Sequence, residues 1–173
     1  GETFARECVA VAEARLAERE PERVACAMVL ALAYRHVGKF DLGLVSAERA
    51  YRQSLVAFGT DKPHRRKIEA RVIYGRALAD SGDLARGLTE IETAVAESRA
   101  LLGPSTQATG IYLQKMIAYR VDLGDLDGAE ANAADALAIL GGAMGREAAA
   151  YAIAEHGRAL AHGLGVTAAI VAK

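Results

Sequence analysis

A glycine-centred turn recurs along this chain at a nearly constant interval. It reads His-Val-Gly-Lys-Phe around Gly38, Asp-Ser-Gly-Asp-Leu around Gly82 and Asp-Leu-Gly-Asp-Leu around Gly124, at intervals of 44 and 42 residues. The segment 155–163 also echoes the residues around Gly75. A period of this size is typical of repeat proteins, in which one small supersecondary unit packs on the next. The sequence therefore predicts a stack of similar units.

Each segment between the glycine and proline positions carries apolar residues at helical spacing, and none sustains strand-like alternation. Ala, Leu, Glu and Arg, which favour helices, dominate throughout. We expect an all-α chain of seven or eight helices, with Asp83, Ser105 and Asp125 as N-terminal caps and Gly141-Gly142 ending the seventh. The expected ranges are about 3–18, 22–37, 41–58, 64–81, 84–102, 106–123, 126–140 and 146–162, with a further start at 166–172.

Helices joined in this way predict a right-handed solenoid of antiparallel helix pairs, since each pair buries its apolar faces only against its neighbours. We interpret residues 1–173 as one repeat domain. Its parts are a leading helix (1–20), three repeats (22–58, 64–102 and 105–140) and a partial fourth (145–173). From the abrupt ends we expect the chain to be a fragment of a longer protein.

The composition disfavours several classes of partner. The 21 basic and 22 acidic residues nearly cancel, so we expect neither nucleic acid nor an anionic membrane as a partner. The longest apolar run, 24–34, is about half the length that a bilayer span needs. No secretory signal is visible, which predicts a cytoplasmic protein.

Cys8 and Cys26 lack the spacing of a zinc or redox pair, and we interpret them as buried thiols in preference to a disulfide.

Neither catalytic nor metal-binding patterns are present, so we expect no enzyme activity, no metal and no cofactor. The four histidines, His36, His64, His156 and His162, form no i, i+4 pair. The serines lie in no nucleophile elbow or triad-like context, and the turn glycines are not grouped as a phosphate cradle. The one dense basic segment, 62–67, could bind phosphate or nucleic acid. A solvated loop is the preferred interpretation, because no aromatic residues lie among its charges.

The recurring small residues carry a resemblance to a known family. Beside the turn glycines, three further positions repeat with the same period: Ala31, Gly75 and Gly157; Gly43, Gly87 and Ala129; Ala50, Ala94 and Ala136. Over residues 22–172 the chain resembles tetratricopeptide repeats, in the longer form found in kinesin light chains and bacterial regulators. Two positions depart from the pattern: Ile117 occupies the small-residue position of the third repeat, and Leu164 that of the turn glycine in the fourth.

The resemblance implies that the first helix of each pair lines a concave groove that receives a peptide or a partner helix. The residues that would face this groove are Met28, Leu32, Arg35, His36, Glu69, Val72, Arg76, Asp80, Ile111, Gln114, Ala118, Asp122, Tyr151, Ala154, Arg158 and His162. Arg76 and Arg158 occupy equivalent places, where each could hold a carboxylate of the ligand. Alternatively, each could pair with a nearby carboxylate of the chain, such as Asp80, Asp122 or Glu155.

We therefore expect a protein-interaction module whose partner is a protein or peptide. Binding of chaperone tails is disfavoured, because Met28 and Leu32 stand where the family's carboxylate clamp needs polar residues. One alternative is a regulatory or sensor segment of a larger transcriptional regulator or signalling protein. Another is a self-assembling scaffold, a homo-oligomer that stacks through the terminal segment 148–171.

Overall fold

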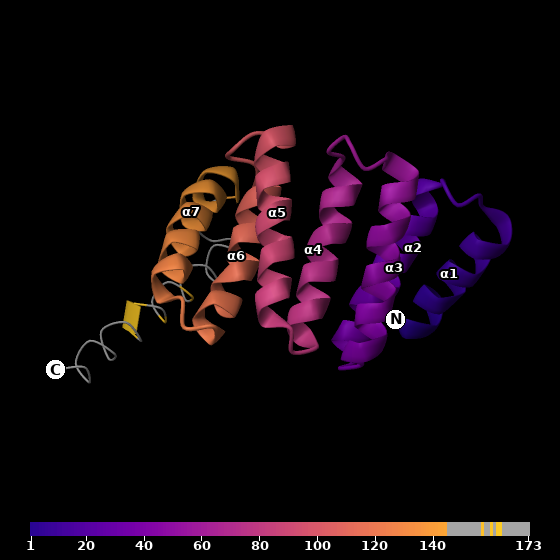
Figure 1. The fold of residues 1–173 in the computed structure, drawn as a ribbon, viewed down its shortest axis with the longest axis horizontal. Helices are drawn as coiled ribbons and strands as arrows, with labels where there is room; N and C mark the ends of the chain where they lie inside the picture. The colour runs from indigo at the N-terminus through magenta and orange to yellow at the C-terminus, as the bar shows by residue number, and fades with distance from the viewer. Residues whose placement is uncertain (145–156, 158–159, 161, 164–173) are drawn as a thin grey trace. The chain divides into compact units, whose positions relative to one another are not determined.

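The computed structural model describes residues 1–144, 157, 160, 162 and 163. These contain seven helices and no strand (Figure 1). The helices are α1 (Glu2–Arg15), α2 (Pro21–His36), α3 (Phe40–Phe58), α4 (Arg65–Asp80), α5 (Leu84–Leu102), α6 (Gln107–Asp122) and α7 (Leu126–Met144). Most of their ends lie within one helical turn of the predicted ones, so the all-α prediction is confirmed. The helix expected at 146–162 lies almost entirely outside the described residues.

Glycine makes the tight turn inside each helix pair. Gly38 follows α2, Gly82 follows α4 and Gly124 follows α6, with φ of 72°, 99° and 77°. Glycine adopts this left-handed conformation without the steric penalty that a Cβ brings. A backbone hydrogen bond closes each turn, for example from the Asp83 N–H to the Leu78 carbonyl at 2.9 Å. The periodic glycines of the sequence therefore mark the turns that they were predicted to mark.

The paired helices α4 and α5 approach most closely at two glycines. A Cβ on Gly75 would lie 2.7 Å from the carbonyl oxygen of Gly87, and one on Gly87 would lie 2.5 Å from that of Gly75. In the preceding pair, a Cβ on Gly43 would lie 3.6 Å from the carbonyl oxygen of Ala31. The small residues at these positions thus allow the helix backbones to touch, which is the reason they recur.

The contacts divide the chain into two compact units, 1–97 and 98–173, with the boundary inside α5. In the first unit, α2, α3 and α4 pack side by side and share two apolar clusters (Figure 1). One is built on Val24, Ala27, Met28, Ala50 and Ala70, the other on Ala31, Ala47, Tyr74, Ala77 and Leu78. In the second unit, α6 packs on α7 and buries Leu113, Met116 and Ile117, while α7 buries Ala133, Ala136 and Leu140. The division into one leading helix and successive repeats stays a prediction.

Two details of the helix ends differ from expectation. Gly141 and Gly142 were predicted to end the seventh helix, but α7 continues to Met144. Neither glycine has a positive φ, and a helix tolerates glycine at a cost of about 1 kcal/mol. The cap of α6 is Thr106 and not Ser105, because the Thr106 hydroxyl accepts from the Thr109 N–H. The expected caps Asp83 and Asp125 are confirmed: they accept the N–H groups of Arg86 and Gly128.

The preference for free thiols at Cys8 and Cys26 was wrong. The two side chains form a disulfide that links α1 to α2, with Cα atoms 5.4 Å apart. The sequence separation of 18 residues hid this pairing, because it matches no known motif. The turn between Arg15 and Pro21 folds α2 back on α1, and this brings the two positions face to face.

Candidate interaction surface

A small hollow opens where α2, α3 and α4 meet in the first unit. Its lining combines apolar side chains with three charged ones: Ala31, Leu32, Arg35, Phe40, Gly43, Ile73, Arg76, Ala77 and Asp80. The cavity volume of about 10 Å³ is that of about one water molecule. It is therefore too small to enclose a metabolite, whose pockets usually measure several hundred Å³. It can still accept a side chain laid across the surface.

Arg35 and Asp80 form an ion pair at this hollow. The Arg35 Nε donates to Asp80 Oδ2 at 2.5 Å, and a terminal guanidinium nitrogen donates to Oδ1 at 3.4 Å. The Asp80 side chain is only 14% exposed. Two hydrogen bonds from one guanidinium to one carboxylate fix the orientation of both groups. This pair ties the end of α2 to the end of α4.

Arg76 lies beside this pair but does not join it. Its Nε is buried and has no hydrogen-bond partner among the described residues. The sequence left open whether Arg76 pairs with Asp80, and in the structure Asp80 is bound to Arg35 instead. Of the other carboxylates considered, Asp122 belongs to the second unit and Glu155 lies outside the described residues. Among the described residues, therefore, a carboxylate binds one arginine of the hollow, Arg35, and none binds the other, Arg76.

The other predicted groove residues of the first unit lie in three kinds of environment. Met28 and Val72 are buried, 8% and 5% exposed. His36 is exposed at the end of α2. Glu69 accepts hydrogen bonds from Arg65 at 3.0 Å and from Arg66 at 3.4 Å. Leu32, Arg35, Arg76 and Asp80 are thus the predicted residues that the hollow brings together. Their role in binding a partner stays a prediction.

In the second unit, the predicted residues of α6 also differ in burial. Gln114 is buried, Ile111 is half-buried, and Ala118 and Asp122 are exposed. His162 is exposed, and its Nδ1 lies 4.0 Å from a carboxylate oxygen of Glu130. Tyr151, Ala154 and Arg158 lie outside the described residues, as does the segment proposed for self-assembly except for a few positions. These assignments also stay predictions.

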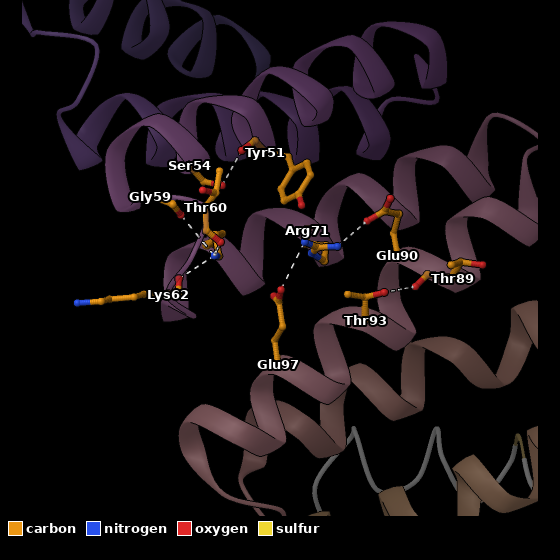
Figure 2. Close-up of polar contacts among 11 residues, drawn as sticks. Tyr51, Ser54, Gly59, Thr60, Lys62, Arg71, Thr89, Glu90, Thr93 and Glu97 are labelled. Carbon is orange, nitrogen blue, oxygen red and sulfur yellow. Dashed lines mark hydrogen bonds and ion pairs between the residues drawn. The ribbon is translucent and has the colours of Figure 1, made fainter.

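A polar network that the sequence analysis missed joins α3, α4 and α5. Arg71 pairs with Glu90 at 3.2 Å and with Glu97 at 3.4 Å, so its guanidinium lies between two carboxylates of α5 (Figure 2). The same guanidinium lies 4.9 Å from the centre of the Tyr51 ring. Cation–π contact and two ion pairs together hold the three helices in register. The sequence signal that could have indicated this network is the spacing of Glu90 and Glu97, which places two carboxylates two turns apart on one face of α5.

The aromatic part of this network extends the contact from α3 to α4. The rings of Tyr51 and Tyr74 stack with centroids 5.7 Å apart. The Arg86 guanidinium lies 5.8 Å from the Tyr74 ring centre and donates to the Tyr74 hydroxyl at 2.8 Å. Burial raises the pKa of both tyrosines above the ordinary value for a phenol. These contacts give Tyr51 and Tyr74 a role in packing between the helices.

The basic segment 62–67 is only partly a solvated loop. Lys67 is 2% exposed, and its ammonium donates to the carbonyls of Thr60 at 3.0 Å and Lys62 at 2.7 Å, with Gly59 at 3.4 Å. These three carbonyls gather at the turn after α3 (Figure 2). The prediction of a solvated segment was therefore wrong for Lys67, which organises the turn. Arg65 and Arg66 both pair with Glu69 and are exposed, as a solvated segment requires.

The described residues offer neither a metal site nor a membrane span. No group of three or more His, Cys, Asp or Glu side chains in that part of the chain could hold a metal ion. No helix among the described residues has the length and apolar character that crossing a membrane requires.

The arrangement of the helices matches that of known repeat proteins. Two solved structures of a kinesin-light-chain-type protein from Podosopora anserina, made of nearly identical TPR-like repeats, superpose with TM-scores of 0.77 and 0.76. Each is 18% identical to this chain, and each alignment covers 95% of this chain and 77% of the other. The chain has a tetratricopeptide-like fold.

A third structure supports the same conclusion. The tetratricopeptide-like chain superposes on BtubC (BKLC) from P. vanneervenii with a TM-score of 0.73 at 16% identity, covering 96% of this chain and 72% of the other. No protein-family model matches the sequence, and no curated protein does. The likeness is therefore one of fold, as the periodic small residues predicted.

Proposed function

We propose that this chain is a protein-interaction scaffold that binds a peptide or a partner helix at the hollow between α2, α3 and α4, with a carboxylate of the ligand held by Arg76. The tetratricopeptide-like fold supports a protein partner, since stacked helix pairs offer extended surfaces for binding. The observation that carries the proposal is the unpartnered Nε of Arg76 beside an Asp80 that Arg35 already binds.

The physical argument rests on the chemistry of the guanidinium group. Its N–H groups form a planar fork that matches the two oxygens of a carboxylate. A buried donor without an acceptor is unfavourable, so a ligand oxygen that reaches the Arg76 Nε removes this penalty as well as forming a new bond. The Arg35–Asp80 pair contributes no net charge, and this leaves Arg76 as the uncompensated positive charge of the hollow.

The apolar part of the lining favours a particular kind of ligand. Leu32, Phe40 and Ile73 contribute to the hollow, and Phe40 is 43% exposed. Because the cavity is small, the ligand lies across the surface and inserts no bulky group. A peptide with an acidic residue close to an apolar residue satisfies both parts of the surface. Burying the apolar side chain would supply affinity, and the carboxylate would fix the orientation of the peptide.

Selection from a random dodecapeptide phage library tests this proposal without a known partner. The wild-type chain is expected to enrich peptides containing Asp or Glu next to an apolar residue. Selection on Arg76→Gln should lose the acidic preference. The matched control is Arg52→Gln, because Arg52 is exposed on α3 and pairs with Glu48 outside the hollow. This control should enrich the same peptides as the wild type.

Binding of the best enriched peptide is then measured by fluorescence anisotropy. Loss of one charge-assisted contact should weaken binding to Arg76→Gln by about 10- to 100-fold. Replacing the acidic residue of the peptide by its amide should weaken binding to the wild type similarly and add little loss to Arg76→Gln. Peptides enriched without acidic residues, or equal binding to both chains, would contradict the proposal.

The remaining functional hypotheses stay predictions. A role as the regulatory segment of a larger protein depends on neighbouring sequence. Self-assembly through residues 148–171 depends on a segment that is largely outside the described residues. Binding at Ile111, Gln114 or Asp122 on α6 can be tested with the enriched peptide and the variants Ile111→Ala and Asp122→Asn.

A further inference from the structure

The Cys8–Cys26 disulfide is a covalent link between two helices of the first unit. Cys8 lies in the middle of α1 and Cys26 in the first half of α2. Their Cα separation of 5.4 Å is within the range that a disulfide spans without displacing the backbone. Both cysteines are half-buried, so a small thiol reagent can approach the sulfur atoms from solvent.

The non-covalent attachment of α1 is weak by comparison. Its buried apolar residues are Ala5, Val9 and Ala12, of which two are alanines. Two further apolar side chains of α1, Phe4 and Val11, are 71% and 55% exposed. Hydrophobic stabilisation is proportional to the apolar area removed from water. Because α1 buries mostly alanine, its own packing contributes little to keeping it in place.

Ion pairs add only a modest contribution to this attachment. Glu2 of α1 accepts a hydrogen bond from Lys39 at 2.7 Å, and Glu13 pairs with Arg49 of α3. The side chains of Lys39 and Arg49 are 48% and 39% exposed. Exposed pairs of this kind contribute little to stability and are screened by salt.

Two apolar clusters of the first unit form without residues of α1. These clusters draw their residues from α2, α3 and α4. Arg35–Asp80 and the stacked pair Tyr51–Tyr74 also join these three helices to one another. Detaching α1 would therefore leave the clusters and the main polar contacts of the unit intact.

We propose that the Cys8–Cys26 disulfide is a reducible clasp, and that a dithiol reductant releases α1 from α2 while α2, α3 and α4 stay folded. One thiolate of the reductant attacks a sulfur of the disulfide and forms a mixed disulfide, and one cysteine leaves as a thiolate. The second thiol of the reductant then displaces the other cysteine. Two electrons and two protons pass to the chain, which gains two thiols, and the reductant becomes a cyclic disulfide.

The size of the effect follows from the length of chain that the disulfide closes. With a separation of 18 residues, loop-closure entropy corresponds to about a 200-fold change in the equilibrium between attached and detached α1. Reduction also uncovers the face of α2 that carries Cys26, one helical turn from Leu30. The redox state thereby controls whether α1 occupies this face or leaves it open to another helix.

Hydrogen exchange measured by mass spectrometry on the whole chain tests the clasp. The oxidised chain is compared with the same chain in dithiothreitol. Amides of α1 should exchange at least 10-fold faster after reduction, whereas amides of α3 and α4 should not change. The double variant Cys8→Ser with Cys26→Ser should show fast exchange in α1 with or without dithiothreitol, which controls for effects of the reagent elsewhere.

Three outcomes would overturn the proposal. Unchanged exchange in α1 after reduction would mean that packing alone holds the helix. A simultaneous rise in α1, α3 and α4 would mean that the disulfide supports the whole unit and releases nothing selectively. Two free thiols in the air-oxidised chain, counted by alkylation and mass, would mean that the clasp does not form. The comparison on the wild-type chain decides the matter even if the double variant folds poorly.

Discussion

Replacing three glycines by alanine, one at a time, distinguishes the physical reasons for which this chain uses glycine. At Gly75 a Cβ would lie 2.7 Å from the Gly87 carbonyl oxygen and 2.8 Å from Ile91 Cγ1. At Gly38 there is open space, but φ is 72°. At Gly142, inside α7, there is open space and φ is not positive. We therefore predict a packing effect at Gly75, a backbone effect at Gly38 and neither at Gly142.

The expected magnitude at Gly75→Ala comes from the crossing of α4 and α5. The Cβ meets a backbone oxygen, which cannot rotate away as a side chain can, so the helices must move apart by about 0.5 Å. A gap of this size forfeits about a quarter of each dispersion contact across the interface. The overpacking cost is about 3 kcal/mol, and alanine returns about 1 kcal/mol through its helix propensity. The net loss should be about 2 kcal/mol.

The two comparison variants should behave differently for stated reasons. Gly38→Ala places a Cβ in left-handed backbone, which costs about 1–2 kcal/mol and is partly offset by the lower entropy of the unfolded chain. A net loss of about 1 kcal/mol is expected. Gly142→Ala lowers the entropy of the unfolded chain and improves helix propensity, so stability should rise by at most about 1 kcal/mol.

Thermal denaturation followed by circular dichroism measures the three variants beside the wild type. Melting temperatures should fall by about 4–8 °C for Gly75→Ala, by about half as much for Gly38→Ala, and rise slightly for Gly142→Ala. The pair Gly75→Ala with Gly87→Ala should cost less than the two single losses combined, because one separation of the helices accommodates both methyl groups. If Gly75→Ala proves as stable as the wild type, the close-crossing explanation of the repeat is wrong.

Two further predictions concern polar groups. Lys67→Met leaves the carbonyls of Gly59, Thr60 and Lys62 without their donor and should destabilise the chain by about 2 kcal/mol, whereas the exposed Lys62→Met should change stability by less than about 0.5 kcal/mol; urea midpoints test both. The Gly128 N–H and then Arg120 hold the pKa of Asp125 below its usual value, so the stabilisation from this carboxylate is present above the unfolded-state pKa of about 3.9 and is lost as the pH falls through the lower folded-state value. Asp125→Asn should accordingly lower the urea midpoint at pH 7 but not at the acid end of the range, and an equal difference at both pH values would refute this origin.

The repeat architecture could be predicted because it depends on residues that admit few alternatives. A turn with positive φ selects glycine strongly, so Gly38, Gly82 and Gly124 mark their positions in the sequence itself. A close crossing of two helix backbones also excludes most side chains. Gly75 and Gly87 lie at such a crossing, and their positions in the sequence indicate it. Each of these constraints arises from local geometry, and the residues that satisfy it recur at the period of the repeat. They can therefore be recognised without knowing which other residues lie nearby.

Polar pairing could not be predicted in the same way, because it depends on small differences in position. Lys67 belongs to a run of basic residues, and its neighbours Arg65 and Arg66 point to solvent. Lys67 lies one residue further along the helix, so its side chain points in a different direction around the helix axis. It faces the carbonyls of the preceding turn instead. The pairing of Cys8 with Cys26 likewise depends on how the turn after α1 brings two helices together, which no spacing in the sequence records.

The difficulty of predicting polar pairs also affects the functional residues of the hollow, which include Arg35, Arg76 and Asp80. All three were predicted to share one surface, and the hollow does bring them together. The spacing of Arg76 and Asp80, four residues apart on α4, favoured a pair within one helix. Asp80 instead binds Arg35 of α2, because this places its carboxylate across two helices and satisfies both of its oxygens. The functional proposal depends on this choice of partner, because the binding of Asp80 to Arg35 is what leaves Arg76 of α4 to hold the carboxylate of a ligand.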